Sequence, residues 1–167
     1  AAQWARANGY ELRATGIDTN KRVLDVARRL CRDEPAISLI HCDAMKLLDE
    51  AESPFAPSSF DYVHAGMFLH HLDEPVVPRM LAAMARLARA GFVWNDLIRS
   101  RQGYAVAWLA TIGQTIRHDC LASLRAGFTE SEVLALASQL GLSYARYSER
   151  YFCQRFFLAG EKPDAWT

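Results

Sequence analysis

The chain has 167 residues, of which 51% are hydrophobic and 23% are charged. These proportions are typical of one soluble globular domain, and they exclude a disordered or fibrous chain. Lys plus Arg and Asp plus Glu both number 19, so the formal net charge is zero and no nucleic-acid partner is expected. Because no apolar run approaches the roughly 18 residues of a membrane span, no membrane association is expected either.

The cysteines and the first ten residues indicate a cytoplasmic protein. The four cysteines are widely spaced and form no Cys-x-x-Cys pair; they are Cys31, Cys42, Cys120 and Cys153. This spacing favours reduced thiols over disulfides or zinc ligands. Residues 1–10 carry polar side chains in a helical pattern, which is unlike a secretory signal peptide.

The first strand and helix are predicted between Tyr10 and Arg32. Residues 10–18 form an apolar run that ends in Asp18, and an amphipathic helix is predicted over 21–32. The buried stripe expected on this helix comprises Val23, Leu24, Ala27, Leu30 and Cys31. Ligands of parallel sheets bind at the carboxyl ends of strands, and an acid there can bind ribose hydroxyls. Asp18 is therefore a candidate ribose ligand.

The same pattern recurs in the next segment. Residues 37–42 form a second apolar run, which ends in Asp43. Two such runs with a helix between them favour a parallel α/β sheet. A short helix is predicted over 44–51, followed by a loop rich in Pro and Ser over 53–59.

Further strands are predicted over 60–66 and 91–95, and the second is followed by Asp96. The helix between them begins near Pro75 and is expected to bury Val77, Met80, Leu81, Met84, Leu87 and Ala88. An aromatic-rich helical segment over 100–117 then interrupts the alternation of strands and helices, so it is a candidate cap over a pocket.

The end of the chain predicts a helix and a hairpin. Thr129 and Glu132 have the spacing of a capping box, and the helix that they begin is expected to end at Gly141. Residues 142–147 and 151–159 are strand-like and are joined by a short charged turn. Two strands joined so closely should pair in antiparallel fashion.

In order and spacing, five motifs resemble the class I S-adenosylmethionine-dependent methyltransferases. They are Thr15-Gly16-Ile17-Asp18, His41-Cys42-Asp43-Ala44, Ser59-Phe60-Asp61-Tyr62-Val63, Leu69-His70-His71-Leu72 and Arg155-Phe156-Phe157-Leu158-Ala159-Gly160. The resemblance implies a single domain over 1–167 with a Rossmann-like α/β fold. This fold is a three-layer sandwich with a mostly parallel sheet and a C-terminal antiparallel hairpin. The implied cofactor is S-adenosyl-L-methionine.

The resemblance also implies positions that bind the cofactor. Asp18 matches the acid that accepts hydrogen bonds from the two ribose hydroxyls, and Asp43 matches the acid that receives the adenine amino group. The other implied positions lie beside the ribose, along the adenine ring, or toward the methionine part of the cofactor; in chain order they are Thr19, Ala44, Met45, Ala65 and Gly66.

One hallmark of that family is missing from the sequence. The family's first strand and its glycine-rich turn are absent, and residues 1–8 resemble the helix that follows them. In the family this strand lies between the strands that end here at Asp18 and Gly66. We therefore expect the chain to be N-terminally incomplete, and to bind the cofactor weakly or not at all on its own.

The sequence offers two candidates for a general base. Transfer of a methyl group from a sulfonium depends mainly on alignment of the reactants, so no catalytic triad is needed. A base assists when the acceptor atom is an oxygen, and the candidates are His118, oriented by Asp119, and His70. Because His70 and His71 are adjacent, they cannot share one face of a helix or strand, and no metal site is predicted.

The predicted reaction is methyl transfer to a small molecule, most simply to an oxygen of an aromatic or polyketide-like acceptor. A narrower resemblance over 95–129, to a bacterial subgroup associated with secondary metabolism, supports this acceptor. Residues 97–128 are interpreted as a substrate-capping insertion, and a homodimer is compatible with the sequence.

Two other functions stay open. A non-catalytic binding or structural domain of the same fold is favoured by the missing glycine-rich turn. A nicotinamide-dependent oxidoreductase would share the ribose-binding Asp18, but the terminal hairpin and Asp43 disfavour it.

Overall fold

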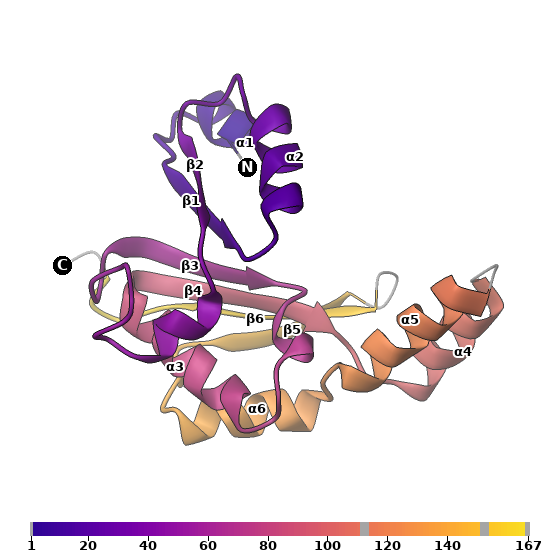
Figure 1. The fold of residues 1–167 in the computed structure, drawn as a ribbon. Coiled ribbons are helices and arrows are strands. Elements are labelled where there is room, and N and C mark those ends of the chain that lie inside the picture. The colour runs from indigo at the N-terminus through magenta and orange to yellow at the C-terminus, as the bar shows by residue number, and fades with distance from the viewer. Residues whose placement is uncertain (1, 111–113, 151–153, 166–167) are drawn as a thin grey trace. The chain divides into compact units, whose positions relative to one another are not determined.

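The chain divides into two compact units, residues 1–54 and 55–167. The computed structural model describes residues 2–110, 114–150 and 154–165. In the first unit, strand β1 (Ala14–Asp18) pairs in parallel with β2 (Ile37–His41), as predicted. Helix α1 (Ala2–Ala7) precedes β1, helix α2 (Lys21–Leu30) connects the two strands, and the 3-10 helix η1 (Ala44–Leu48) follows β2 (Figure 1).

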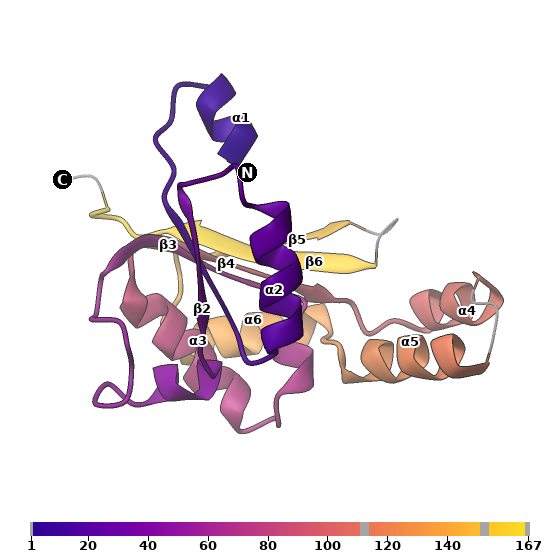
Figure 2. The same ribbon diagram turned by 45° about the horizontal axis from the view of Figure 1, so that its top comes forward.

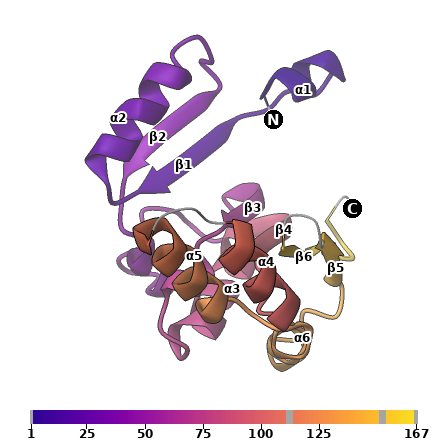
Figure 3. The ribbon, with the colours of Figure 1, turned by 90° about the vertical axis from the view of Figure 1, so that its right-hand side faces the viewer.

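Helix α2 lies along one face of the β1–β2 pair (Figure 3). The side-chain oxygen of Asn20 caps it by accepting the backbone N–H groups of Arg22 at 3.0 Å and Val23 at 3.4 Å. The predicted buried stripe is wrong in its extent, because Leu24 alone is buried in this helix while Leu30 is 80% exposed. A two-stranded sheet covers only a narrow strip of a helix surface, and the rest of the stripe therefore stays accessible.

The second unit is built on a four-stranded sheet in the order β3-β4-β6-β5. Its strands are β3 (Phe60–Gly66), β4 (Ala88–Leu97), β5 (Arg146–Arg150) and β6 (Arg155–Glu161). β3 and β4 are parallel, whereas β6 runs antiparallel to both β4 and β5. The mixed sheet with a terminal antiparallel hairpin confirms the predicted fold class.

The hairpin begins later than predicted because the preceding helix has its own closing structure. Helix α6 (Glu130–Gln139) ends with Gly141 at a φ of +66°. The N–H of Leu142 donates to the carbonyl of Ala137 at 2.8 Å, and that of Gly141 donates to Ser138 at 3.1 Å. These two bonds form a Schellman motif. The first residues of the predicted strand thus end the helix, and β5 begins at Arg146.

Helices cover one face of the four-stranded sheet. α3 (Val76–Leu87) and α6 lie on the same side of it, and the pair α4 (Arg101–Ala110) and α5 (Gln114–Ala126) extends beyond the carboxyl ends of β3 and β4 (Figures 1 and 2). The six residues predicted to be buried by the α3 segment are all buried, although Ala88 begins β4 rather than ending the helix. The core centres on Trp94, whose ring packs edge-on against Phe128 and Phe156 with centroid distances of 4.8 and 4.9 Å.

Candidate functional site

Two carboxylates lie at the carboxyl ends of the parallel strands in the first unit. Asp18 is the last residue of β1 and pairs in register with His41, so that Asp43 follows the same end of β2. Asp18 Oδ1 accepts the N–H of Asn20 at 2.6 Å, and Asp43 Oδ1 accepts the N–H of Met45 at 2.9 Å. The described residues donate no hydrogen bond to either Oδ2 atom. Each acid therefore keeps one oxygen available for a ligand.

The segments around these acids are held by bonds between the two strand ends. His41 Nε2 donates to the carbonyl oxygen of Thr19 at 2.9 Å, and the N–H of Cys42 donates to the carbonyl of Asp18 at 3.1 Å. Asp43 caps η1, which begins with the half-buried Ala44 and the partly exposed Met45. Five of the predicted cofactor residues thus flank one end of the β1–β2 pair.

Ala65 and Gly66, the other two predicted cofactor residues, end strand β3 of the second unit. They pair in register with Trp94 and Asn95 of β4. His64 Nε2 donates to Asn95 Oδ1 at 2.6 Å, and a Cβ atom added to Gly66 would lie 2.9 Å from that same oxygen. A side chain at position 66 would therefore displace the neighbouring polar pair of His64 and Asn95.

The backbone turns sharply after this strand. Met67 has a φ of +55°, a left-handed conformation that costs a non-glycine residue about 1 kcal/mol. Its N–H donates to the carbonyl oxygen of Asn95 at 2.8 Å, which ties the turn to β4. The 3-10 helix η2 (Leu69–His71) follows at once. Such conformations often occur at functional sites.

His70 and Asp96 form a buried hydrogen-bonded pair that was not predicted from the sequence. His70 Nδ1 lies 2.6 Å from Asp96 Oδ1, and their side chains are 3% and 0% exposed. The sequence placed His70 after one strand and Asp96 after another. Since neighbouring parallel strands end at the same edge, this shared edge was the signal that could have joined the two residues.

Asp96 is surrounded by donors. Besides the His70 ring, the N–H of Leu97 donates to Oδ1 at 3.0 Å, while the N–H of His70 and Trp94 Nε1–H donate to Oδ2 at 3.2 and 3.3 Å. Burial alone would raise the pKa of Asp96, but these hydrogen bonds and the His70 charge lower it below its usual value. The buried group is therefore a carboxylate at neutral pH.

The His71 ring lies against the His70 ring in a tilted arrangement. The His70 and His71 rings have a centroid distance of 3.9 Å and an interplanar angle of 41°. Burial and the adjacent His70 lower the pKa of His71, against an opposing effect of Asp96. His71 is accordingly expected to be neutral at pH 7.

His118 and Asp119, the other predicted catalytic residues, lie on α5. His118 Nδ1 is 3.6 Å from Asp119 Oδ1, and the side chains are 84% and 77% exposed. The pair thus has the predicted proximity but lies on an open helix surface. Its catalytic role stays a prediction.

The segment interpreted as a substrate-capping insertion forms the helical pair α4–α5. Arg125 Nη2 donates to the Tyr104 hydroxyl at 2.5 Å, and the guanidinium lies 5.2 Å from the centre of the Tyr104 ring. α5 also packs against η2, which carries His70. Trp108 is 52% exposed, whereas Ile112 of the same predicted helical segment lies outside the described residues.

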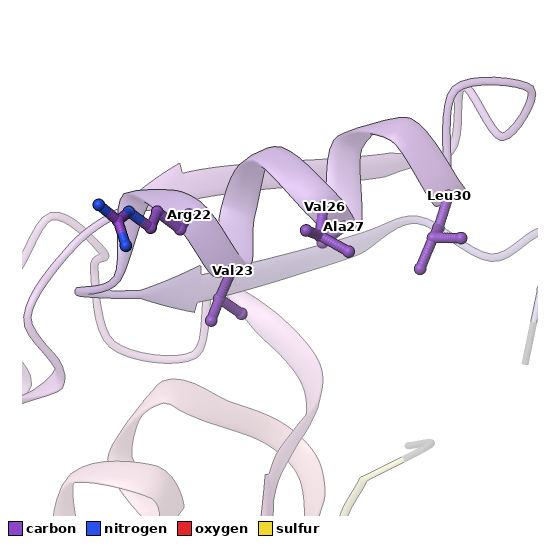
Figure 4. A pocket seen from close by; sticks show the side chains of 5 residues that line it. All are labelled: Arg22, Val23, Val26, Ala27 and Leu30. Atoms are coloured by element: carbon purple, nitrogen blue, oxygen red, sulfur yellow. The ribbon is translucent and has the colours of Figure 1, made fainter.

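A shallow apolar hollow on α2 was not predicted as an accessible surface (Figure 4). Its lining residues are Arg22, Val23, Val26, Ala27 and Leu30. It lies along the side of the helix and offers no carboxylate or amide side chain to a ligand. We therefore assign the candidate cofactor site to the carboxyl ends of β1 and β2, where Asp18 and Asp43 lie.

Within residues 2–110, 114–150 and 154–165, no group of three His, Cys, Asp or Glu side chains is arranged to hold a metal ion. In the same ranges no helix has both the length and the apolar character needed to cross a membrane. Cys31, Cys42 and Cys120 are free thiols, and Cys153 lies outside the described residues.

Comparison with known proteins identifies the family. The sequence profile of a family described as "Methyltransferase domain" matches residues 1–91, more than half of the chain. The chain belongs to this methyltransferase domain family. A demethylmenaquinone methyltransferase of Staphylococcus saprophyticus is 34% identical over 85 residues, which are 51% of this chain and 32% of that relative. The match thus spans about a third of the relative's length.

Solved structures support the methyltransferase fold. A SAM-dependent methyltransferase from Aquifex aeolicus superimposes with a TM-score of 0.59 at 14% identity, over 89% of this chain and 68% of that one. The plantazolicin methyltransferase BpumL, solved with a pentazolic desmethylPZN analog and SAH, gives a TM-score of 0.67 at 12% identity. That superposition covers 96% of this chain and 71% of BpumL. The methyltransferase domain thus has a Rossmann-like α/β fold.

Proposed function

We propose that this methyltransferase domain uses S-adenosylmethionine to methylate a small molecule, at an oxygen of an aromatic or polyketide-like acceptor. The observation that carries the proposal is the pair Asp18 and Asp43. Acids at the carboxyl ends of adjacent parallel strands are suited to bind an adenosine group. Family membership supports the reaction, and a relative named for demethylmenaquinone supports a small-molecule acceptor.

The hydrogen-bond acceptors at the strand ends of the first unit fit the proposed cofactor. Asp18 Oδ2 can accept from a ribose hydroxyl while Oδ1 keeps its bond to Asn20, and Asp43 Oδ2 can accept from an adenine amino group while Oδ1 caps η1. Ala44 and Met45 provide a small and an apolar side chain beside Asp43. When bound, S-adenosylmethionine supplies a methyl group that is already activated on a sulfonium.

The chain's own contribution to the reaction is then mainly binding and orientation. Holding the reactants in line supplies much of the acceleration of such a displacement. His70, in η2 at the end of β3, is the proposed base for an acceptor hydroxyl, and α4–α5 is the proposed cap over the acceptor. The same proposal includes a cytoplasmic location and a homodimer, both of which stay predictions from the sequence.

Binding of S-adenosylhomocysteine to the complete gene product tests the cofactor site. Asp18→Asn keeps an oxygen for the Asn20 N–H but loses the charge and one acceptor, so the affinity should fall by about 10-fold or more, the usual effect of losing a charged hydrogen bond. Isothermal titration calorimetry measures the affinity for S-adenosylhomocysteine in both proteins.

The matched control is Asp25→Asn. Asp25 lies on α2 and forms a surface pair with Arg28 at 3.0 Å, so this change should leave the affinity unaltered. Equal affinities of the Asp18 variant and the unchanged protein would refute the ribose-binding role. Tight binding without methyl transfer to any hydroxylated acceptor would instead favour the non-catalytic alternative.

A further inference from the structure

The hydrogen bonds around Asp96 fix the tautomer of the neutral His70 ring. A carboxylate can only accept hydrogen bonds, and Asp96 accepts from two backbone N–H groups and the Trp94 indole as well as from the His70 ring. The contact of 2.6 Å between His70 Nδ1 and Asp96 Oδ1 therefore requires a proton on Nδ1. In the neutral ring, Nε2 is then the basic nitrogen.

The other ring nitrogen is left unused by the protein. Within the described part of the chain, the hydrogen bond of the His70 ring is made through Nδ1, and no partner is found for Nε2. η2 lies at the carboxyl edge of β3 and β4, where ligands of parallel sheets bind, and it is also packed against α5. A buried acid thus holds one nitrogen of a histidine whose second nitrogen has no hydrogen-bond partner among the described residues.

We propose that Asp96 is a positioning residue that keeps the His70 proton on Nδ1, so that Nε2 takes the proton of an acceptor hydroxyl during methyl transfer. This inference rests on the proposed function. As the hydroxyl proton moves to Nε2, the acceptor oxygen forms a bond to the methyl carbon. The carbon–sulfur bond breaks and its electron pair stays on sulfur. The resulting imidazolium is stabilised by the Asp96 carboxylate until it loses the proton to solvent.

Asp96→Asn separates this role from simple packing. An amide has one acceptor oxygen, and the Oδ2 side of Asp96 faces two donors that cannot change, the N–H of His70 and Trp94 Nε1–H. The Oδ1 side faces the fixed N–H of Leu97 and the His70 ring, which can switch tautomer. The amide nitrogen should therefore turn toward His70. Nδ1 then becomes an acceptor and the proton moves to Nε2.

The first test is the tautomer of His70, read from the ¹⁵N chemical shifts of its ring in long-range ¹H–¹⁵N spectra. The signals are assigned by their loss in His70→Gln. The unchanged protein should show a protonated Nδ1, and Asp96→Asn a protonated Nε2. Trp94→Phe, which removes one donor to Asp96 but keeps the His70–Asp96 pair, should lower stability and leave the tautomer unchanged. A protonated Nε2 in the neutral ring of the unchanged protein would overturn the inference.

The second test is kinetic and uses 2-naphthol as the hydroxyl probe with the complete gene product. Asp96→Asn should lower kcat by about 100-fold or more, the usual contribution of a general base, with little change in the KM for 2-naphthol or in affinity for S-adenosylhomocysteine. An unchanged kcat would overturn the role of Asp96. No transfer to 2-naphthol by the unchanged protein would count against the proposed oxygen acceptor, while the tautomer still decides the role of Asp96.

Discussion

At the scale of single residues, the Tyr62 hydroxyl has a strongly raised pKa. Its hydroxyl bonds to Glu161, and this bond, burial and the charges of Glu161 and Asp61 raise the pKa of Tyr62 to about 12, against an opposing effect of Arg89. Tyr62 lies opposite Gly91 on β4, and Gly91 lies opposite Glu161 on β6. Because glycine has no side chain, the phenol can reach across the middle strand.

Replacing Glu161 with Gln should lower the pKa of Tyr62 toward its ordinary value near 10, because the acceptor loses its negative charge. Absorbance at 295 nm during a pH titration measures ionisation of the phenol, and subtracting the curve of Tyr62→Phe isolates this tyrosine. An unshifted titration in the Glu161 variant would contradict the assignment.

The raised pKa also fixes the direction of its effect on stability. The folded state holds the Tyr62 proton more tightly than the unfolded chain does. The bond therefore contributes fully below about pH 10, where both states are protonated, and is lost as the pH rises through about 12.

At the scale of elements, the capping box predicted at Thr129 is confirmed. The N–H of Glu132 donates to the Thr129 hydroxyl at 3.4 Å, and the N–H of Thr129 donates to Glu132 Oε2 at 2.8 Å. Burial would raise the pKa of Glu132, but the bonds from Thr129 and the nearby Arg99 lower it. The start of α6 is thus fixed by two reciprocal bonds, just as its end is fixed by the Schellman motif.

Removing this cap should destabilise the protein. Thr129→Ala is expected to lower the free energy of unfolding by about 1 kcal/mol, because one backbone donor loses its acceptor at the helix start. Thr129→Ser keeps the hydroxyl and should cost much less. Urea denaturation followed by circular dichroism measures both, and equal losses in the two variants would show that the methyl group, rather than the hydroxyl, matters.

At the scale of the whole molecule, the two units differ in the support given to their strands. β1 and β2 form a two-stranded sheet that packs against α2, whereas β4 lies between β3 and β6 and carries the buried Phe92 and Trp94. A two-stranded sheet is marginally stable by itself. The first unit should therefore open at a lower free energy than the second.

Hydrogen exchange followed by mass spectrometry tests this difference. Peptides that contain β1 and β2 should exchange faster than peptides from β4 and β6 under native conditions, by about 10-fold or more if the opening free energies differ by at least 1.4 kcal/mol. Equal protection in the two units would show instead that they open as one. The free energies of unfolding of the variants above would then describe a single cooperative transition.

The sequence was sufficient for the elements whose signals are local. The stripe of α3, the capping box at Thr129 and the parallel pairing of β1 with β2 depend on periodicity and on short-range spacing, and all three are confirmed. The α2 stripe was wrong because burial depends on how much sheet lies beneath a helix. The late start of β5 was not predicted, because Gly141 and Leu142 close α6 through backbone hydrogen bonds that the side-chain pattern does not show.

The candidate site was likewise predictable only in part. Asp18 and Asp43 are recognisable in the sequence as acids at the ends of apolar runs. In the structure Asp18 ends β1 and Asp43 follows the adjacent end of β2. The bond between His70 and Asp96 joins residues 26 positions apart. This bond depends on which strands are neighbours and on the turn at Met67. Met67 adopts a left-handed conformation there, which its residue type does not predict.

The row formed by Tyr62, Gly91 and Glu161 constrains how this sheet can evolve. Any side chain at position 91 would collide with the backbone oxygen of Gly160 and fill the path between the phenol and the carboxylate. We therefore expect substitutions at positions 62, 91 and 161 to depend on one another. A homologue with a larger residue at position 91 must change the β4–β6 pairing. Its residues at positions 62 and 161 then need not be a tyrosine and an acid, because the hydrogen bond between them is lost.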